Sequence, residues 1–138
     1  MKQGFTWLDC RMDGVQNFIA NLSKDALLHY PSIYSVQLDD HFAIPLVFFP
    51  QNSSATIVAE LTRAAAKVSS SVQSTGRLSI SPASLDFALS NYAVDWLSWA
   101  KLHLFSTFYP QMCAPTRMPG PCALTTFQIP LHRQSLQR

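Results

Sequence analysis

Two adjacent carboxylates and an imidazole, Asp39, Asp40 and His41, are the side chains of this sequence best suited to chemistry. They follow residues 33–38, a run rich in β-forming residues, so we expect them where a strand ends. A carboxylate in that position can act as a nucleophile, a general acid or a metal ligand. Aspartate is also common at strand ends for a local reason, because it caps the turn that follows. The spacing alone leaves both interpretations open.

Side chains alternate between the two faces of a strand, so the run before Asp39 should have two different faces. One face becomes polar toward its carboxyl end and carries Ile33, Ser35, Gln37 and Asp39. The other face is apolar and carries Tyr34, Val36 and Leu38. We therefore expect Asp39 and Gln37 to face a site. Asp40 should turn outward, where it caps the next segment or holds a neighbour.

His41 stands beside two carboxylates, and such a group could in principle hold a metal ion. No second group of histidines or carboxylates occurs at a matching spacing elsewhere in the sequence. We therefore expect no metal and no cofactor, and we assign His41 to substrate binding. Dinucleotide, phosphate-loop, nucleophile-elbow and zinc-protease motifs are also absent from the sequence.

The composition predicts one small domain with a hydrophobic core. The chain has 138 residues, of which 48% are hydrophobic and 13% are charged. No apolar run is long enough to cross a membrane, and residues 1–14 lack the apolar stretch of a signal peptide, so the localisation stays unassigned. The net charge of +2 comes from three arginines after residue 115, so no nucleic-acid surface is expected. The cysteines have no metal-binding spacing and are expected to be free thiols.

Helical and strand patterns alternate along the chain. Helices are expected at residues 13–30, 55–72 and 84–101, the last with a break near Asn91, and strands at 33–40, 77–82 and 104–109. This order predicts an α/β fold with a parallel sheet and right-handed crossovers. The apolar stripe of the first helix, expected to pack on the core, consists of Val15, Phe18, Ile19, Leu22 and Ala26.

The carboxyl ends of the three strands should lie on one rim of that sheet. Strands two apart end within roughly 10 Å of each other, so polar side chains at these ends should share a cleft with Asp39. Those expected to bind substrate there are Ser81, Tyr109 and Gln111. The apolar residues Leu38, Ile80 and Phe108 should point the other way, under the helices.

Four separate stretches resemble a known family. They read WLDCRMDGVQNFIANL, YSVQLDDHFAIP, LSISPASLDFALSNYAVDWLSWAK and LFSTFYPQM. In order and spacing they are similar to the glycosyl-hydrolase-like family 10 domain, a group of bacterial TIM-barrel proteins, over about residues 5–115. The resemblance implies a (β/α)8 barrel and hydrolysis of glycosidic bonds in a polysaccharide. It also implies that Asp39 and Asp40 lie at the substrate end and are the catalytic candidates.

The chain departs from that family in its length. A (β/α)8 barrel typically needs about 250 residues, and this sequence holds about three consecutive βα units, so we expect a barrel fragment. Residues 1–115 form the barrel segment, and residues 116–138 are expected to be a divergent, disordered tail. Asp39 has no second acid on the other strand ends, so the alternative is an inactive fragment with at most weak carbohydrate binding. Open sheet edges predict self-association.

Overall fold

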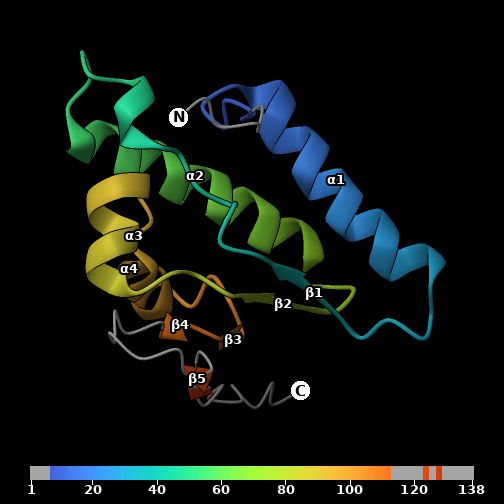
Figure 1. The fold of residues 1–138 in the computed structure, drawn as a ribbon. Coiled ribbons are helices and arrows are strands. Elements are labelled where there is room, and N and C mark those ends of the chain that lie inside the picture. The colour runs from blue at the N-terminus through green and yellow to red at the C-terminus, as the bar shows by residue number, and fades with distance from the viewer. Residues whose placement is uncertain (1–6, 113–122, 125–126, 129–138) are drawn as a thin grey trace.

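The computed structural model describes residues 7–112 together with 123–124 and 127–128. In chain order its helices and strands are α1 (Asp13–His29), β1 (Ser35–Leu38), the 3-10 helix η1 (Leu46–Phe48), α2 (Ser54–Val72), β2 (Arg77–Ile80), α3 (Leu85–Tyr92), α4 (Trp96–Lys101), β3 (Thr107–Phe108), β4 (Gln111–Met112), β5 (Ala123–Leu124) and β6 (Phe127–Gln128). From α1 to β3 the helical and strand segments follow one another in the order that the sequence predicts, with η1 added after β1 and the third helix divided into α3 and α4 (Figure 1). None of the described helices has the length and apolar character that a membrane crossing requires.

The central sheet has the strand order β1-β2-β3-β6. β1 pairs with β2 in parallel, and β2 pairs with β3 in parallel, so the predicted three-stranded parallel sheet is confirmed. β6 runs antiparallel along β3, and β4 and β5 form a separate antiparallel pair. The disorder expected for residues 116–138 concerns residues that lie outside the described part of the chain, apart from β5 and β6.

Local sequence signals explain where the helices begin and end. The Ser53 hydroxyl accepts a hydrogen bond from the Thr56 N–H and caps the start of α2. The expected helix at residues 84–101 is divided in two because Ala93 adopts a left-handed conformation with φ 57°. Asp95 then caps α4 by accepting a hydrogen bond from the Ser98 N–H. The break that the sequence predicted near Asn91 is therefore confirmed, two residues further along.

Gly76 connects α2 to β2 at a place with no room for a side chain. A Cβ atom built on it would lie 2.8 Å from the Leu27 side chain and 3.0 Å from the Tyr34 carbonyl oxygen. The N–H of the next residue, Arg77, donates a hydrogen bond to that same carbonyl at 3.2 Å. Glycine therefore lets α1, β1 and β2 come together at this turn.

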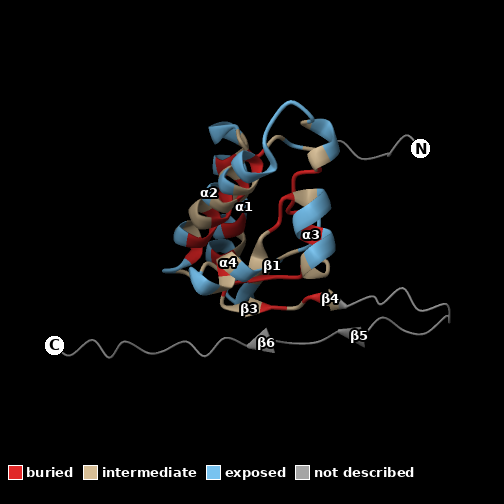
Figure 2. Cartoon of the chain, turned by 90° about the vertical axis from the view of Figure 1, so that its left-hand side faces the viewer, coloured by how far each residue is buried: buried red, intermediate tan, exposed pale blue. Residues whose placement is uncertain are grey.

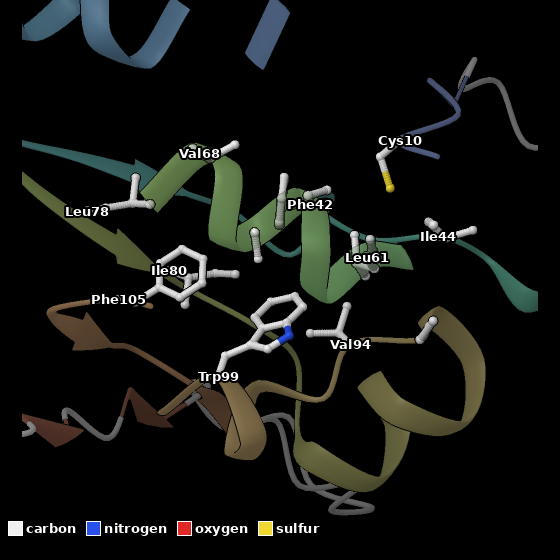
Figure 3. Packing of buried hydrophobic residues seen from close by; sticks show 14 of the residues in the cluster. Cys10, Phe42, Ile44, Leu61, Val68, Leu78, Ile80, Val94, Trp99 and Phe105 are labelled. Carbon is white, nitrogen blue, oxygen red and sulfur yellow. The ribbon is translucent and has the colours of Figure 1, made fainter. Parts of the chain in front are cut away.

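The core lies between the sheet and the helices, around Trp99 (Figure 3). Ile80 and Phe108 are buried and Leu38 packs partly buried against them, so their predicted position under the helices is confirmed. The Trp99 indole N–H donates a hydrogen bond of 2.9 Å to the Thr62 hydroxyl, which satisfies its polar atom inside the core. Buried residues gather on the inner sides of the helices, whereas α3 is mostly exposed (Figure 2).

The face that α1 turns toward α2 differs from the prediction. Its buried residues are Gln16, Ala20, Ser23 and Leu27. Two members of the expected apolar stripe, Val15 and Ile19, pack partly buried against the core, whereas Phe18 and Leu22 are 58% and 59% exposed. Small residues let the two helices approach closely, so that the Ser71 hydroxyl donates a hydrogen bond to the Ala20 carbonyl. Close helix packing rather than hydrophobicity therefore selects the buried face.

Replacing Trp99 by alanine should lower the free energy of unfolding by about 3–5 kcal/mol, because it empties the centre of the core. Leu97 on the same helix is 43% exposed, so Leu97→Ala is the matched control and should cost less than about 1 kcal/mol. Urea unfolding followed by circular dichroism measures both changes. Equal losses in the two variants would contradict this position of the core.

Candidate functional site

The residues 39–41 form a tight turn at the carboxyl end of β1. The strand ends at Leu38, and the Phe42 N–H donates a hydrogen bond of 3.2 Å to the Asp39 carbonyl. The Asp39 side chain also accepts a hydrogen bond from the His41 N–H, at 3.0 Å. Such a bond from an aspartate to a backbone N–H two residues later fixes both the turn and the carboxylate. Asp39 therefore caps the turn, as the local interpretation expected, while its second oxygen faces His41.

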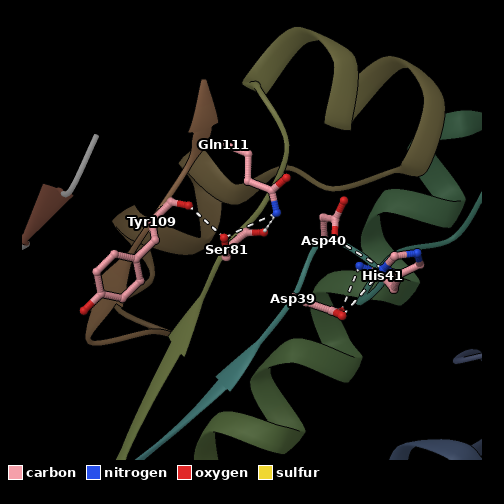
Figure 4. Close-up of polar contacts among 6 residues, drawn as sticks. All are labelled: Asp39, Asp40, His41, Ser81, Tyr109 and Gln111. Carbon is pink, nitrogen blue, oxygen red and sulfur yellow. Dashed lines mark hydrogen bonds and ion pairs between the residues drawn. The ribbon is translucent and has the colours of Figure 1, made fainter. Parts of the chain in front are cut away.

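The turn brings all three candidate side chains together (Figure 4). His41 Nδ1 lies 3.5 Å from an Asp39 oxygen and 3.3 Å from an Asp40 oxygen. Asp40 therefore does hold a neighbour, His41, as one of the expected alternatives had it, but its carboxylate stays close to that of Asp39 and does not diverge from it as predicted. Side chains alternate only while the backbone stays extended, and Asp40 already lies in the turn beyond the strand.

One donor atom from each of these residues lies within 4.8 Å of the other two. The side chains remain well exposed, at 70% for Asp39, 39% for Asp40 and 51% for His41. Their interactions with one another account for this closeness, and exposed acidic groups are common without an ion. The cluster by itself therefore does not assign a metal site, and its donor set suits hydrogen bonding to a polar ligand equally well.

A cavity of about 460 Å³ opens beside this cluster. That volume lies within the range of roughly 300–1,000 Å³ that is usual for ligand sites. Its wall is mostly apolar and includes Trp7, Cys10, Ile19, Asp39, His41 and Leu61. The polar groups of Asp39 and His41 thus stand at the margin of an apolar pocket, an arrangement that can orient a small polar ligand.

Trp7 is the residue of this site that the sequence did not single out. Its ring stacks on the His41 ring with centroids 5.7 Å apart and lies 6.1 Å from the Tyr92 ring. Its indole Nε1 is buried and has no hydrogen-bond partner among the residues that the structure describes. No periodic pattern includes Trp7, and the signals that could have drawn attention to it are its position close before the first helix and its place at the start of the stretch WLDCRMDGVQNFIANL.

Two interactions hold the segment that carries Trp7. Arg11 forms a two-point ion pair with the Asp9 carboxylate, with hydrogen bonds of 2.8 and 2.7 Å, and its guanidinium lies 4.0 Å from the centroid of the Phe49 ring. The buried Gln16 side chain donates a hydrogen bond of 2.8 Å to the Cys10 carbonyl. The pocket wall is therefore attached both to α1 and to the loop that contains η1.

The surroundings of this segment also shift the pKa values of two side chains, Asp9 and Cys10. The hydrogen bonds from Arg11 lower the pKa of Asp9. Burial raises the pKa of the Cys10 thiol to about 12, and the nearby Asp9 charge adds to the effect. Cys10 therefore stays a neutral thiol at neutral pH, so it contributes an apolar surface to the pocket and does not serve as a nucleophile.

The other predicted side chains form a second group. Ser81 Oγ donates a hydrogen bond of 3.0 Å to the Tyr109 carbonyl, and the Gln111 amide donates one of 3.3 Å to the Ser81 carbonyl (Figure 4). Neither Ser81 nor Gln111 lines the cavity of about 460 Å³ beside Asp39 or the cavity of about 10 Å³ beside Asp40. Gln37 is exposed on β1. Ser81 and Gln111 are therefore hydrogen-bonded within a group of their own, in which Tyr109 takes part through its carbonyl.

Asp9→Asn should lower the free energy of unfolding by about 1 kcal/mol near neutral pH. Because the folded protein lowers the pKa of Asp9, this stabilisation is complete above the unfolded value of about 3.9 and is lost as the pH falls through the lower folded value. The difference between variant and wild type in urea unfolding should therefore shrink toward zero in strong acid. The exposed Asp25 gives the control, since Asp25→Asn should change stability by less than about 0.5 kcal/mol. A pH-independent loss in Asp9→Asn would contradict the ion pair.

Comparisons with known proteins were made for the whole chain. No known protein family matches it, and no curated protein matches it. The functional assignment therefore rests on the residues of the site and on the arrangement of the strands that position them.

Proposed function

We propose that this chain is a glycoside hydrolase-like protein whose pocket beside Asp39 binds a sugar unit of a polysaccharide. One observation carries the proposal. The Asp39–His41 turn follows a parallel strand and borders the cavity that Trp7 also lines. Sugar rings have hydroxyl groups that donate to carboxylates and C–H faces that pack on aromatic rings, and this pocket offers both kinds of surface.

The proposal includes the architecture of a (β/α)8 barrel, of which this chain would form about three βα units. It is supported by three parallel strands whose connecting helices pack on the face that carries Leu78, Ile80 and Phe108. In such barrels the ligand site lies at the carboxyl ends of the strands. Asp39 and Ser81 follow the carboxyl ends of β1 and β2. This part of the proposal extends the resemblance of four sequence stretches to the glycosyl-hydrolase-like family 10 domain noted in the sequence analysis.

Sugar binding is better supported than hydrolysis. A retaining glycosidase holds two carboxyl groups roughly 5–5.5 Å apart on either side of the bond, and an inverting one roughly 6.5–9.5 Å apart. Asp39 and Asp40 have oxygens within 4.8 Å of each other, and both approach the same nitrogen of His41. They therefore stand on one side of any ligand and cannot flank its glycosidic bond. Hydrolysis remains the second candidate, favoured by the position of Asp39 at a strand end.

The proposal predicts weak, specific binding of neutral oligosaccharides. In an NMR titration with a panel of oligosaccharides and peptidoglycan fragments, the indole N–H resonance of Trp7 should shift, while the resonance of the core residue Trp99 should not. Asp39→Asn and Trp7→Ala should each weaken binding about tenfold, the effect of losing a hydrogen bond or a ring contact. Asp25→Asn, on α1, should leave binding unchanged.

Two outcomes would change this assignment. Absence of any shift with the whole panel, or shifts that persist unchanged in both pocket variants, would refute sugar binding at this site. Release of reducing sugar by the wild type, abolished in Asp39→Asn, would instead establish hydrolysis and would require a second acid in the reaction.

A further inference from the structure

We propose that two copies of this chain pair through the open edge of β1 and the apolar face of α1, about a twofold axis at Val36. β1 is the end strand of the sheet, and it pairs with β2 on one side only within the described residues. α1 contacts β1 and lies at the same end of the molecule, away from β3 (Figure 1). One side of the molecule therefore presents both a backbone edge and a helix face.

The hydrogen bonds to β2 identify the backbone groups that face the open edge. The carbonyls of Tyr34 and Leu38 accept hydrogen bonds from β2 and the residue after it, at 3.2 and 2.9 Å. In an extended strand the N–H and C=O of one residue point to the same side, and the side alternates from residue to residue. Ser35 and Gln37 therefore turn both of their backbone groups toward the open edge.

These groups are self-complementary. In an antiparallel pair, residues that exchange two hydrogen bonds alternate with residues that exchange none. If Val36 faces Val36 of a second copy, Ser35 of each copy lies opposite Gln37 of the other and exchanges both bonds with it. The backbone N–H and C=O groups of Ser35 and Gln37 in each copy are then all hydrogen-bonded to the same groups of the second copy. A twofold interface requires this kind of self-complementary surface.

Three features that commonly prevent such pairing, a charge, a proline and a bulge, are absent from residues 32–38 of this short edge strand. Edge strands of monomeric proteins are usually protected by a charge, a proline or a bulge. Residues 32–38 contain no charged residue and no proline. The register of β1 with β2 is continuous from Ser35 to Leu38, without a bulge. A second strand can therefore approach along its whole length.

The outer face of α1 adds an apolar contact to this edge. Phe18 and Leu22 lie four residues apart on one side of the helix and are both more than half exposed. The twofold axis at Val36 runs perpendicular to the sheet, so the sheets of the two copies join edge to edge. The α1 helices of both copies then lie side by side on the same face of this combined sheet. The two apolar faces then cover each other.

The size of this surface sets the expected affinity. A strand of four residues and a few turns of helix contribute on the order of 10 residues per copy, against 20–30 per side in an ordinary stable interface. We therefore expect a dimer that dissociates in the micromolar range and that does not grow further, because the twofold pairing uses up the β1 edge.

Sedimentation of the full chain over a range of concentrations tests the proposal. Wild type should pass from monomer to dimer, and Leu22→Lys should weaken association at least tenfold. Leu28→Lys is the matched control, because Leu28 is similarly exposed but lies about a third of a turn around the helix. A wild type that stays monomeric at 200 μM, assemblies that grow beyond a dimer, or equal effects of the two substitutions would overturn the proposal.

A crosslink tests the axis itself. In a chain with Cys113→Ser and Cys122→Ser, Val36→Cys should form an intermolecular disulfide under mild oxidation, because facing residues in such a pair lie about 4.5 Å apart. Ser35→Cys should not, since the two Ser35 positions would lie roughly 7–8 Å apart. Crosslinking of both variants at similar rates, or of Ser35→Cys alone, would rule out this register.

Discussion

The parallel pairing of β1 with β2 is the constraint on which the rest of the structure depends. Its register runs from Ser35 beside Arg77 to Leu38 beside Ile80. Because side chains alternate along both strands, this ladder directs apolar residues under the helices and polar ones to the opposite face. The same ladder ends at Leu38 and so starts the turn that gathers Asp39 and its neighbours. It also leaves one side of β1 without a partner strand within the described residues.

The stability of the fold does not depend on the charged groups of the candidate site. The core around Trp99 removes large side chains from water, whereas the ion pairs of the Asp39–His41 turn are exposed to solvent. Exposed ion pairs of this kind typically contribute only about 0–1 kcal/mol. The cluster is therefore not needed to hold the fold. Its shape comes from the hydrogen bond between the Asp39 carboxylate and the His41 N–H, which orients the carboxylate before any ligand arrives.

The order of helices and strands could be predicted because each element carries its own periodicity and ends at a cap or a proline. The sequence could not predict which face of a helix would be buried or which distant segments would come into contact. Periodicity located an apolar stripe with Phe18 and Leu22, but close approach of α2 favoured the face with Gln16. Alternation placed Asp39 correctly at a strand end and failed for Asp40, which lies in the turn. Trp7 reaches the pocket through contacts between distant segments, and no local pattern records such contacts.

The turn at Gly76 has a consequence for how freely this sequence can vary. Any other residue would place a carbon against the buried Leu27 side chain and against the Tyr34 carbonyl, which is already engaged by the Arg77 N–H. The Leu27 methyl groups would have to move aside, and the Tyr34 carbonyl would have to shift by a few tenths of an ångström. Position 76 should therefore tolerate few substitutions, although it lies at the opposite end of the strands from the pocket. A library of single substitutions selected only for folding would therefore favour glycine at this position.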